Sequence, residues 1–424
     1  MKAAPPAIGA APAVRLGLGA NARQFALLVV VNAFVGAMVG LERSTLPIVG
    51  REDFGVTSST AVLSFLIAFG VAKACANLFA GARADAVGRR RLLIAGWLLA
   101  LPVPVLIGLA PGWWLVVAAN FLLGMNQGLA WSMTVVMKID LVGPVRRGLA
   151  LGLNEAAGYV GVALAAAAAG WLAADLDARD VLTVGGVAIA LTGLGLSVLT
   201  RDTAGHARVE HAAQAAPRPE RSMRRAFAAG TFRERSLAAC SQAGLVNNLN
   251  DALAWGVAPL FLAAHGASLS EIGLVAGTYP AVWGMGQMLT GALSDRVGRK
   301  PLIVSGMLVQ ALALVMLVLS GAELGPAVAA AALLGAGTAL VYPALIAAVS
   351  DRVTPLERPA AIGVYRFWRD AGYAVGGLLA GALADLGGFD EAILVTAGLT
   401  AASGLVAAAW LREGRQAVPT TSSG

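Results

Sequence analysis

Residues 81–91 read GARADAVGRRR, and residues 291–300 read GALSDRVGRK. Both segments place an acid four residues after a first glycine, and a second glycine directly before a basic run. The matching positions are Gly81, Asp85, Gly88, Arg89 and Arg90, and 210 residues later Gly291, Asp295, Gly298, Arg299 and Lys300. Self-similarity at a fixed offset is the signature of an internal repeat, so we expect two halves built in the same way.

The composition around these motifs is typical of a protein that lies in a lipid bilayer. Of the 424 residues, 58% are hydrophobic and 13% are charged, and the mean hydropathy is +0.74. Soluble domains carry about 25% charged residues, so this chain has too little charge to cover a surface in water. A disulfide-stapled secreted domain and a disordered chain are excluded by the two cysteines and the low charge. We therefore expect an all-α membrane protein.

Twelve apolar segments are long enough to cross a bilayer, for which a helix needs about 20 residues. Six lie in residues 23–200, and six lie in residues 236–411. Residues 201–235 between them are rich in arginine and are expected to form a solvated cytoplasmic linker, with a short amphipathic helix near residues 223–232. The alternative for this linker is a regulatory or lipid-headgroup site. Residues 1–22 contain three prolines and are expected to be a cytoplasmic tail, not a signal peptide, and residues 412–424 form the second tail.

The basic residues predict the orientation of the chain. Of the 31 lysines and arginines, only Arg51 and Arg179 fall in the loops of one side, whereas most of the others fall in the loops and tails of the opposite side. The basic side faces the cytoplasm, so both termini are expected inside the cell inner (plasma) membrane. This topology also accounts for the net charge of +7, and no nucleic-acid partner is expected.

The duplicated loop motif with six spans in each half resembles the major facilitator superfamily over nearly the whole chain. A second repeated pair of residues is Gly158-Tyr159 in the fifth span and Gly372-Tyr373 in the eleventh. The resemblance implies twelve transmembrane helices in two six-helix halves with pseudo-two-fold symmetry, and a monomer that works by alternating access. Many drug exporters of that family carry an arginine in the fourth span, where this chain has Asn120, so the resemblance does not decide the substrate.

In that family, the repeated loop is a cytoplasmic latch between neighbouring spans. Gly88 and Gly298 permit a tight turn, while Asp85 and Asp295 are placed to cap the next helix or to pair with an arginine. Pairs of this kind can form in one conformation and break in another, which suits a gate. The alternative is a loop that only fixes the topology.

Ionisable residues inside a membrane span are costly, and such residues commonly mark a functional site. The eleventh span has three of them within five residues, Arg366, Arg369 and Asp370. Either arginine can bind an acidic group of a substrate, because guanidinium presents a planar fork to a carboxylate or phosphate. The alternative is a salt bridge within the helix that only neutralises its own charges.

The seventh span places Asn247, Asp251 and Trp255 on one helix face, at steps of four residues. Asp251 is a candidate carrier of a transported proton, or else a member of a hydrogen-bond network between helices. Glu155 in the fifth span is the second proton candidate. The repeat aligns it with Arg369, so the two can pair across a central cavity.

Further candidates lie in other spans. Glu42 and Arg43 are near the outer end of the first span, and Lys73 in the second either extends toward the interface or pairs with a buried acid such as Glu155. The remaining candidates for lining a cavity are Asn120, Gln127 and Tyr365.

The sequence therefore predicts a secondary active transporter that moves a small organic solute, with proton-coupled export expected. The alternatives are a proton-coupled uptake symporter and a receptor or scaffold without transport. No enzyme activity and no cofactor or metal are expected, because the chain lacks a His-Glu-x-x-His motif, a phosphate loop and a nucleophile elbow.

Overall fold

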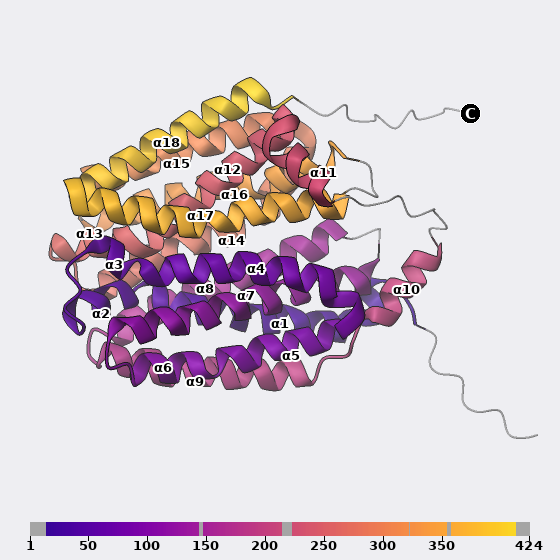
Figure 1. Cartoon of the computed structure of the whole chain (residues 1–424), viewed down its shortest axis with the longest axis horizontal. Helices are drawn as coiled ribbons and strands as arrows, with labels where there is room; N and C mark the ends of the chain where they lie inside the picture. The colour runs from indigo at the N-terminus through magenta and orange to yellow at the C-terminus, as the bar shows by residue number, and fades with distance from the viewer. Residues whose placement is uncertain (1–13, 144–146, 214–222, 322, 354–357, 413–424) are drawn as a thin grey trace, which may run out of the picture.

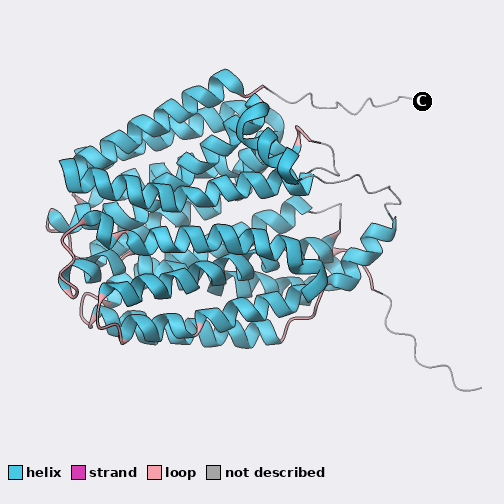
Figure 2. Ribbon diagram, in the orientation of Figure 1, coloured by secondary structure: helices cyan, strands magenta, loops and turns pink. Residues whose placement is uncertain are grey.

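The computed structural model describes residues 14–143, 147–213, 223–321, 323–353 and 358–412. All regular secondary structure among these residues is helical, and the helices run roughly parallel to one long direction of the molecule (Figure 2). Seven of the described helical segments are long and apolar enough to cross a membrane by length and composition. The helices α12 and α17, which carry Asp251 and Arg369, are not among the seven, because their interiors are polar.

The first half contains six spans, some of which are broken. The first span is α1 (Leu18–Arg43) with α2 (Leu46–Glu52), the second α3 (Ser59–Val62) with α4 (Ser64–Val87), and the third α5 (Arg89–Ala100) with α6 (Pro102–Gly108). The other three are α7 (Trp113–Val142), α8 (Arg147–Leu172) and α9 (Ala178–Val198). Prolines at the starts of α2 and α6 fit these breaks, because proline is accepted in the first turn of a helix and not in its interior.

The second half repeats this plan. Its first span runs through α12 (Arg235–Ala252), the π-helix η3 (Leu253–Val257) and α13 (Ala258–Ala264). The other five are α14 (Leu269–Val297), α15 (Arg299–Leu319), α16 (Leu324–Ser350), α17 (Arg358–Gly387) and α18 (Phe389–Trp410). The linker holds α10 (Ala204–Ala213), α11 (Met223–Ala228) and the π-helix η2 (Ala229–Arg233), so the segment expected to contain an amphipathic helix is helical.

Helix packing confirms the internal repeat. In the first half α1 packs on α8 and α4 packs on α7, and in the second half the equivalent spans α12 and α17, and α14 and α16, pack in the same way. The two halves meet along two lines, where α8 contacts α14 and α4 contacts α17 (Figure 1). The expected layout of twelve spans in two halves is thus confirmed.

Figure 1 distinguishes the two ends of the helix bundle. We call the end with α10, α11 and the turns at Gly88 and Gly298 the linker end, and the opposite end, with α2 and α13, the far end. Gly88 has a φ of 97° and Gly298 a φ of 99°. Side chains strongly disfavour this region of backbone conformation, so both repeated turns require glycine, as the motif predicts. Arg51 in α2 and Arg179 in α9 both lie at the far end.

The two halves touch at the far end and diverge toward the linker end. A Cβ atom added to Gly170 of α8 would come within 2.5 Å of the Gly273 Cα in α14, and one added to Gly284 would come within 2.8 Å of Tyr159 Cβ. Gly291 lies seven residues after Gly284, on the same face of α14, and a Cβ added there would meet no atom within 4 Å in the described part of the chain. The same holds for Gly152 at the linker end of α8. Among the described residues, the two halves are therefore in close contact at the far end and not at these two positions of the linker end.

Candidate site between the two halves

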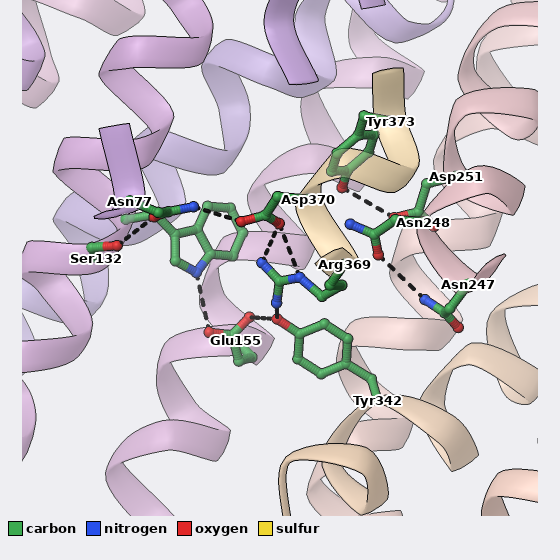
Figure 3. Close-up of polar contacts among 11 residues, drawn as sticks. Asn77, Ser132, Glu155, Asn247, Asn248, Asp251, Tyr342, Arg369, Asp370 and Tyr373 are labelled. Atoms are coloured by element: carbon green, nitrogen blue, oxygen red, sulfur yellow. Dashed lines mark hydrogen bonds and ion pairs between the residues drawn. The ribbon is translucent and has the colours of Figure 1, made fainter. Parts of the chain in front are cut away.

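Asp251 lies at the centre of the second half, at the end of α12. Its carboxylate accepts a hydrogen bond from the hydroxyl of Tyr279 in α14. It accepts another, at 3.0 Å, from the hydroxyl of Tyr373 in α17 (Figure 3). The carboxylate is completely buried. The π-helix η3 begins two residues later, and a π-turn inside an α-helix is often found at a functional site. Asp251 is thus a buried acid held by two phenols from two other helices.

A chain of hydrogen bonds crosses from the first half to the second beside this acid. In α4, Asn77 accepts from Ser132 of α7 at 2.6 Å and donates to Asp370 of α17 at 2.6 Å (Figure 3). Arg369 donates to the Asp370 carboxylate through Nε at 2.9 Å and Nη2 at 2.5 Å, and through Nη1 to the hydroxyl of Tyr342. All three guanidinium nitrogens therefore have a partner, and the salt bridge within the helix, which the sequence left as the alternative for the eleventh span, is present between Arg369 and Asp370.

The chain returns to the first half at Glu155 of α8. The Tyr342 hydroxyl lies 3.5 Å from Glu155 Oε2, while Oε1 accepts from the indole of Trp131 at 3.1 Å and from Asn154 at 3.1 Å. Glu155 and Arg369 do not touch each other in this conformation, and Tyr342 stands between them (Figure 3). The network therefore contains two acids, Glu155 and Asp370, from opposite halves.

Aromatic rings surround this network and join the halves. The ring of Tyr159 in α8 lies 3.6 Å from the ring of Trp283 in α14, measured between centroids. Trp131 is 5.3 Å from Tyr159, and Tyr342 is 5.4 Å from Trp283. Such ring pairs contribute about 0.5–1.5 kcal/mol beyond the area that they bury. They define a central contact that any rocking of the halves must rearrange.

Two cations, Arg43 and Lys73, lie near Asp251 and among aromatic rings. The guanidinium carbon of Arg43 in α1 is 4.7 Å from the ring centroid of Phe69 and 4.9 Å from that of Trp255. Lys73 Nζ in α4 is 5.4 Å from the Phe69 ring and 4.9 Å from the Tyr373 ring. Lys73 is thus buried among these rings, and among the described residues no hydrogen bond or ion pair joins its ammonium group to a buried acid such as Glu155.

The other predicted site residues take different places. Gln127 of α7 donates to the backbone carbonyl of Val35 at 2.9 Å, and Asn120 donates within its own helix. Asn247 accepts from Gln310 of α15 at 3.1 Å, inside the second half. Four further candidates were also predicted from the sequence. Glu42, Trp255 and Tyr365 are buried, and Arg366 is partly exposed.

The sequence analysis did not identify Asn77 and Ser132 as members of the network. It also did not identify Tyr373 as a hydrogen-bond donor to Asp251. Asn77 lies four residues after Lys73 and therefore on the same helix face, so its position was a usable signal. The partners of these residues lie on distant spans, which no spacing along the chain reveals. Among the described residues, no group of three or more histidine, cysteine or acidic side chains is placed to hold a metal ion.

The repeated loop motif forms a matching ion pair in each half. Arg89 Nε lies 3.1 Å from Asp140 Oδ2 at the end of α7, and Arg299 Nε lies 3.2 Å from Asp351 Oδ2 just after α16. The backbone N–H of Arg90 donates to Asp202 of the linker, and Arg299 also donates to Ser294 at 2.5 Å. Asp85 and Asp295 were expected to cap a helix or to pair with an arginine, but their side chains lie outside those that the structure describes. The same is true of Gly81. Arg89 and Arg299 thus tie the loop to the end of the fourth span of their own half.

At the far end, Asp385 near the end of α17 caps a helix of the other half. Its carboxylate accepts from the Ser58 hydroxyl at 2.7 Å, from the Thr60 backbone N–H at 2.9 Å and from the Ser59 backbone N–H. Burial raises the pKa of Asp385, but the hydrogen bonds from Thr60, Ser58 and Ser59 outweigh this effect and lower the pKa to about 2. The contact closes the far end with an ionised acid at a helix N-terminus, where the helix dipole favours negative charge.

Comparison with known proteins agrees with this fold. The family described as the Major Facilitator Superfamily matches residues 25–241 and 240–423. Among solved structures, a POT family transporter in complex with 5-aminolevulinic acid is similar, with a TM-score of 0.74 and 11% identity over 91% of this chain and 96% of that chain. A POT family transporter in complex with a thioalcohol-conjugated peptide has a TM-score of 0.73 at 11% identity, with the same coverage. The nucleoside transporter NupG, as a mutant, has a TM-score of 0.70 and 13% identity over 91% of this chain and 100% of that chain.

Proposed function

The chain belongs to the Major Facilitator Superfamily, and from this membership and its central site we propose that it is a proton-coupled secondary active transporter of a small organic solute. In this proposal the halves rock about the central network and expose the solute site to one side of the membrane at a time. The linker end faces the cytoplasm, as the distribution of basic residues predicts, and the described conformation is the one open to the cytoplasm. Export in exchange for protons is the expected direction.

The observation that supports this proposal is the network that joins Asp370 and Glu155 across the two halves. Hydrogen bonds between Asn77 and Asp370, and between Tyr342 and Glu155, link helices that must separate when the halves rock. Acids whose partners change with conformation are suited to take up a proton in one state and release it in the other. Asp251, held by two phenols of its own half, is the second proposed proton carrier.

The similar transporters suggest which solutes to test first. The proteins in those structures hold a conjugated peptide or 5-aminolevulinic acid, and NupG is a nucleoside transporter. All of these ligands are small organic molecules. We therefore propose a solute of this size for this chain.

The experiment uses the full-length protein in proteoliposomes that contain a pH-sensitive dye. A dipeptide, 5-aminolevulinic acid, a nucleoside and a lipophilic cation are each added outside, and the internal pH is followed. Movement of protons with the solute indicates uptake symport, and movement against it indicates antiport. Vesicles without protein are the control. No proton or solute flux with any compound would contradict the transport proposal.

Asp251→Asn and Glu155→Gln test the coupling residues in the same vesicles. Each amide keeps the size of the side chain and part of its hydrogen bonding but cannot carry a proton. We expect proton-driven flux to fall by more than tenfold in at least one variant, while exchange of solute without a pH gradient persists. Full proton-driven flux in both variants would show that the coupling assignment is wrong.

A further inference from the structure

Arg43 is a buried cation without a hydrogen-bond partner. Its side chain is 0% exposed, and Nε, Nη1 and Nη2 all lack an acceptor in the described part of the chain. A guanidinium has five N–H donors, and a buried charge that is not paired destabilises a protein strongly. The rings of Phe65, Phe69 and Trp255 attract the cation through their faces but accept no conventional hydrogen bond. The structure therefore leaves these donors for another group.

Two further donors lie against the same rings. Lys73 is 9% exposed and contacts the rings of Phe69, Tyr373 and Trp131, with no hydrogen bond or ion pair found for its ammonium group among the described residues. Trp255 is 2% exposed, and its indole Nε1 has no acceptor. Its ring stacks on Tyr373 with an interplanar angle of 12°. Arg43, Lys73 and Trp255 thus form a set of buried donors, which we call the donor pocket.

The nearby acids are engaged elsewhere. Asp251 attracts both cations electrostatically, yet its oxygens accept from Tyr279 and Tyr373. Asp370 attracts Lys73, but its oxygens accept from Asn77 and Arg369. Glu42 is next to Arg43 in the chain, and its Oε2 has no hydrogen-bond partner, so it does not close the pocket either. Donors therefore outnumber free acceptors around Arg43.

We propose that the donor pocket binds the anionic group of the transported solute, so that the substrate class is small organic anions. This inference rests on the proposed transport function. A carboxylate or another oxyanion supplies the acceptors that the pocket lacks, and the guanidinium of Arg43 can bind it with two parallel hydrogen bonds. The rings of Phe69, Tyr373 and Trp255, which surround the two cations, are suited to contact the apolar body of the molecule. Arg369, one of the two arginines that the sequence offered for this role, already donates to Asp370 and Tyr342.

The binding test uses three probes of the same shape and different charge: benzoate, benzamide and benzylamine. Thermal unfolding of the purified full-length protein in detergent is followed at increasing concentrations of each. We expect benzoate to raise the unfolding temperature in a saturable way, because a ligand of the folded state stabilises it, and the other two to have little effect. Inorganic phosphate and sulfate are included. If phosphate or sulfate raises the unfolding temperature as much as benzoate does, the pocket binds simple oxyanions, and the proposal of an organic substrate class is overturned.

Three variants connect the effect to the pocket. Arg43→Gln and Lys73→Gln each remove one cation, and we expect the dissociation constant of benzoate to rise by about tenfold or more in both. Arg43→Lys keeps the charge but loses the planar fork, and should give an intermediate value. Lys138→Gln is the matched control. Lys138 is also a buried lysine whose Nζ lacks a hydrogen-bond partner in the described structure, and no cation–π contact is found between it and the pocket rings among these residues. Benzoate binding should survive this change.

The possible results distinguish a failure of the anion-binding proposal from a failure of the transport proposal. Saturable benzoate binding that is lost in Arg43→Gln and Lys73→Gln supports the pocket even if the vesicle experiment finds no flux. Transport of a neutral or cationic solute that persists in both variants, together with no stabilisation by benzoate, would overturn the anion inference and leave the transport proposal intact. If Arg43→Gln does not fold, Lys73→Gln and Arg43→Lys carry the test. Benzoate binding unchanged in both of these would also overturn the inference.

Discussion

Arg369 and Glu155 are linked through one phenolic oxygen, the hydroxyl of Tyr342. Arg369 Nη1 donates to this oxygen, and the hydroxyl lies 3.5 Å from Glu155 Oε2. The repeat aligns the arginine and the acid, which suggested direct pairing across the halves. Instead, Arg369 pairs with Asp370 on its own helix, and the tyrosine relays its contact to the other half. The link is thus a single weak hydrogen bond that can break at little cost when the halves move.

Removal of this hydroxyl should break the link between Arg369 and Glu155 while the packing stays intact. Tyr342→Phe keeps the ring against Tyr159 and Trp283. We expect a stability loss of about 1.5–3 kcal/mol, the value of a hydrogen bond to a charged group, and a larger loss of proton-driven flux than of solute exchange. Tyr365→Phe is the control, because its hydroxyl is buried without a partner among the described residues. Equal effects of the two changes would mean that the relay has no special role.

The far-end contact at Asp385 should control which end of the protein opens. Asp385→Asn removes the charge that caps the helix of the other half, so the outward-open state should become more populated. Spin labels on Glu52→Cys and Glu391→Cys, in a background with Cys75 and Cys240 replaced by serine, report the distance across the far end. We expect a longer distance to appear in the Asp385→Asn protein. An unchanged distance distribution would show that other contacts hold the far end closed.

The same contact should not respond to pH in the physiological range. The pKa of Asp385 is lowered from 3.8 to about 2 in the folded protein, so the carboxylate contributes to closure wherever it is ionised. That contribution is present in full above the ordinary pKa and is lost only as the pH falls toward 2. We therefore expect the label distance to be constant between about pH 5 and pH 8. A transition in this interval that persists in Asp385→Asn would come from another group.

The two loop latches should differ in strength although their sequences match. Arg89 and Asp140 have side-chain exposures of 7% and 10%, whereas Arg299 and Asp351 have 18% and 43%. Loss of one partner of a buried pair costs about 3–5 kcal/mol, and exposed pairs contribute about 0–1 kcal/mol. Asp140→Asn should therefore lower the unfolding temperature much more than Asp351→Asn. Equal shifts would contradict the ranking by burial.

The sequence was sufficient for the architecture and insufficient for the pairing of charges. Apolar length predicts spans because a bilayer demands it, and the repeated turn predicts Gly88 and Gly298 at a left-handed backbone position. In contrast, the partners of Asp251 come from α14 and α17, and no periodicity brings Tyr279 and Tyr373 to the same carboxylate. The neutralisation of Arg369 by its neighbour Asp370 was one of two alternatives from the sequence, and the three-dimensional arrangement favours it. The same arrangement points to Arg43, in place of Arg369, as the arginine that binds an anionic group of the solute. Helix faces are encoded locally, whereas contacts between distant spans depend on how the halves assemble.

Glycines along the interface between α8 and α14 should show at which end the halves are pressed together. A Cβ on Gly170 would meet the Gly273 Cα at 2.5 Å, so Gly170→Ala must push the far ends of the two helices apart. Gly291→Ala places the same methyl group where the described structure offers nothing within 4 Å, and serves as the matched control.

We expect Gly170→Ala to shift the protein toward the state that is open at the far end, with lengthened distances between labels at Glu52 and Glu391. Gly291→Ala should leave the conformation described here unchanged, while the helix itself gains up to about 1 kcal/mol because alanine is the better helix former. A far-end distance that lengthens equally in both variants would contradict the asymmetry between the two ends, and with it the assignment of this conformation as closed at the far end.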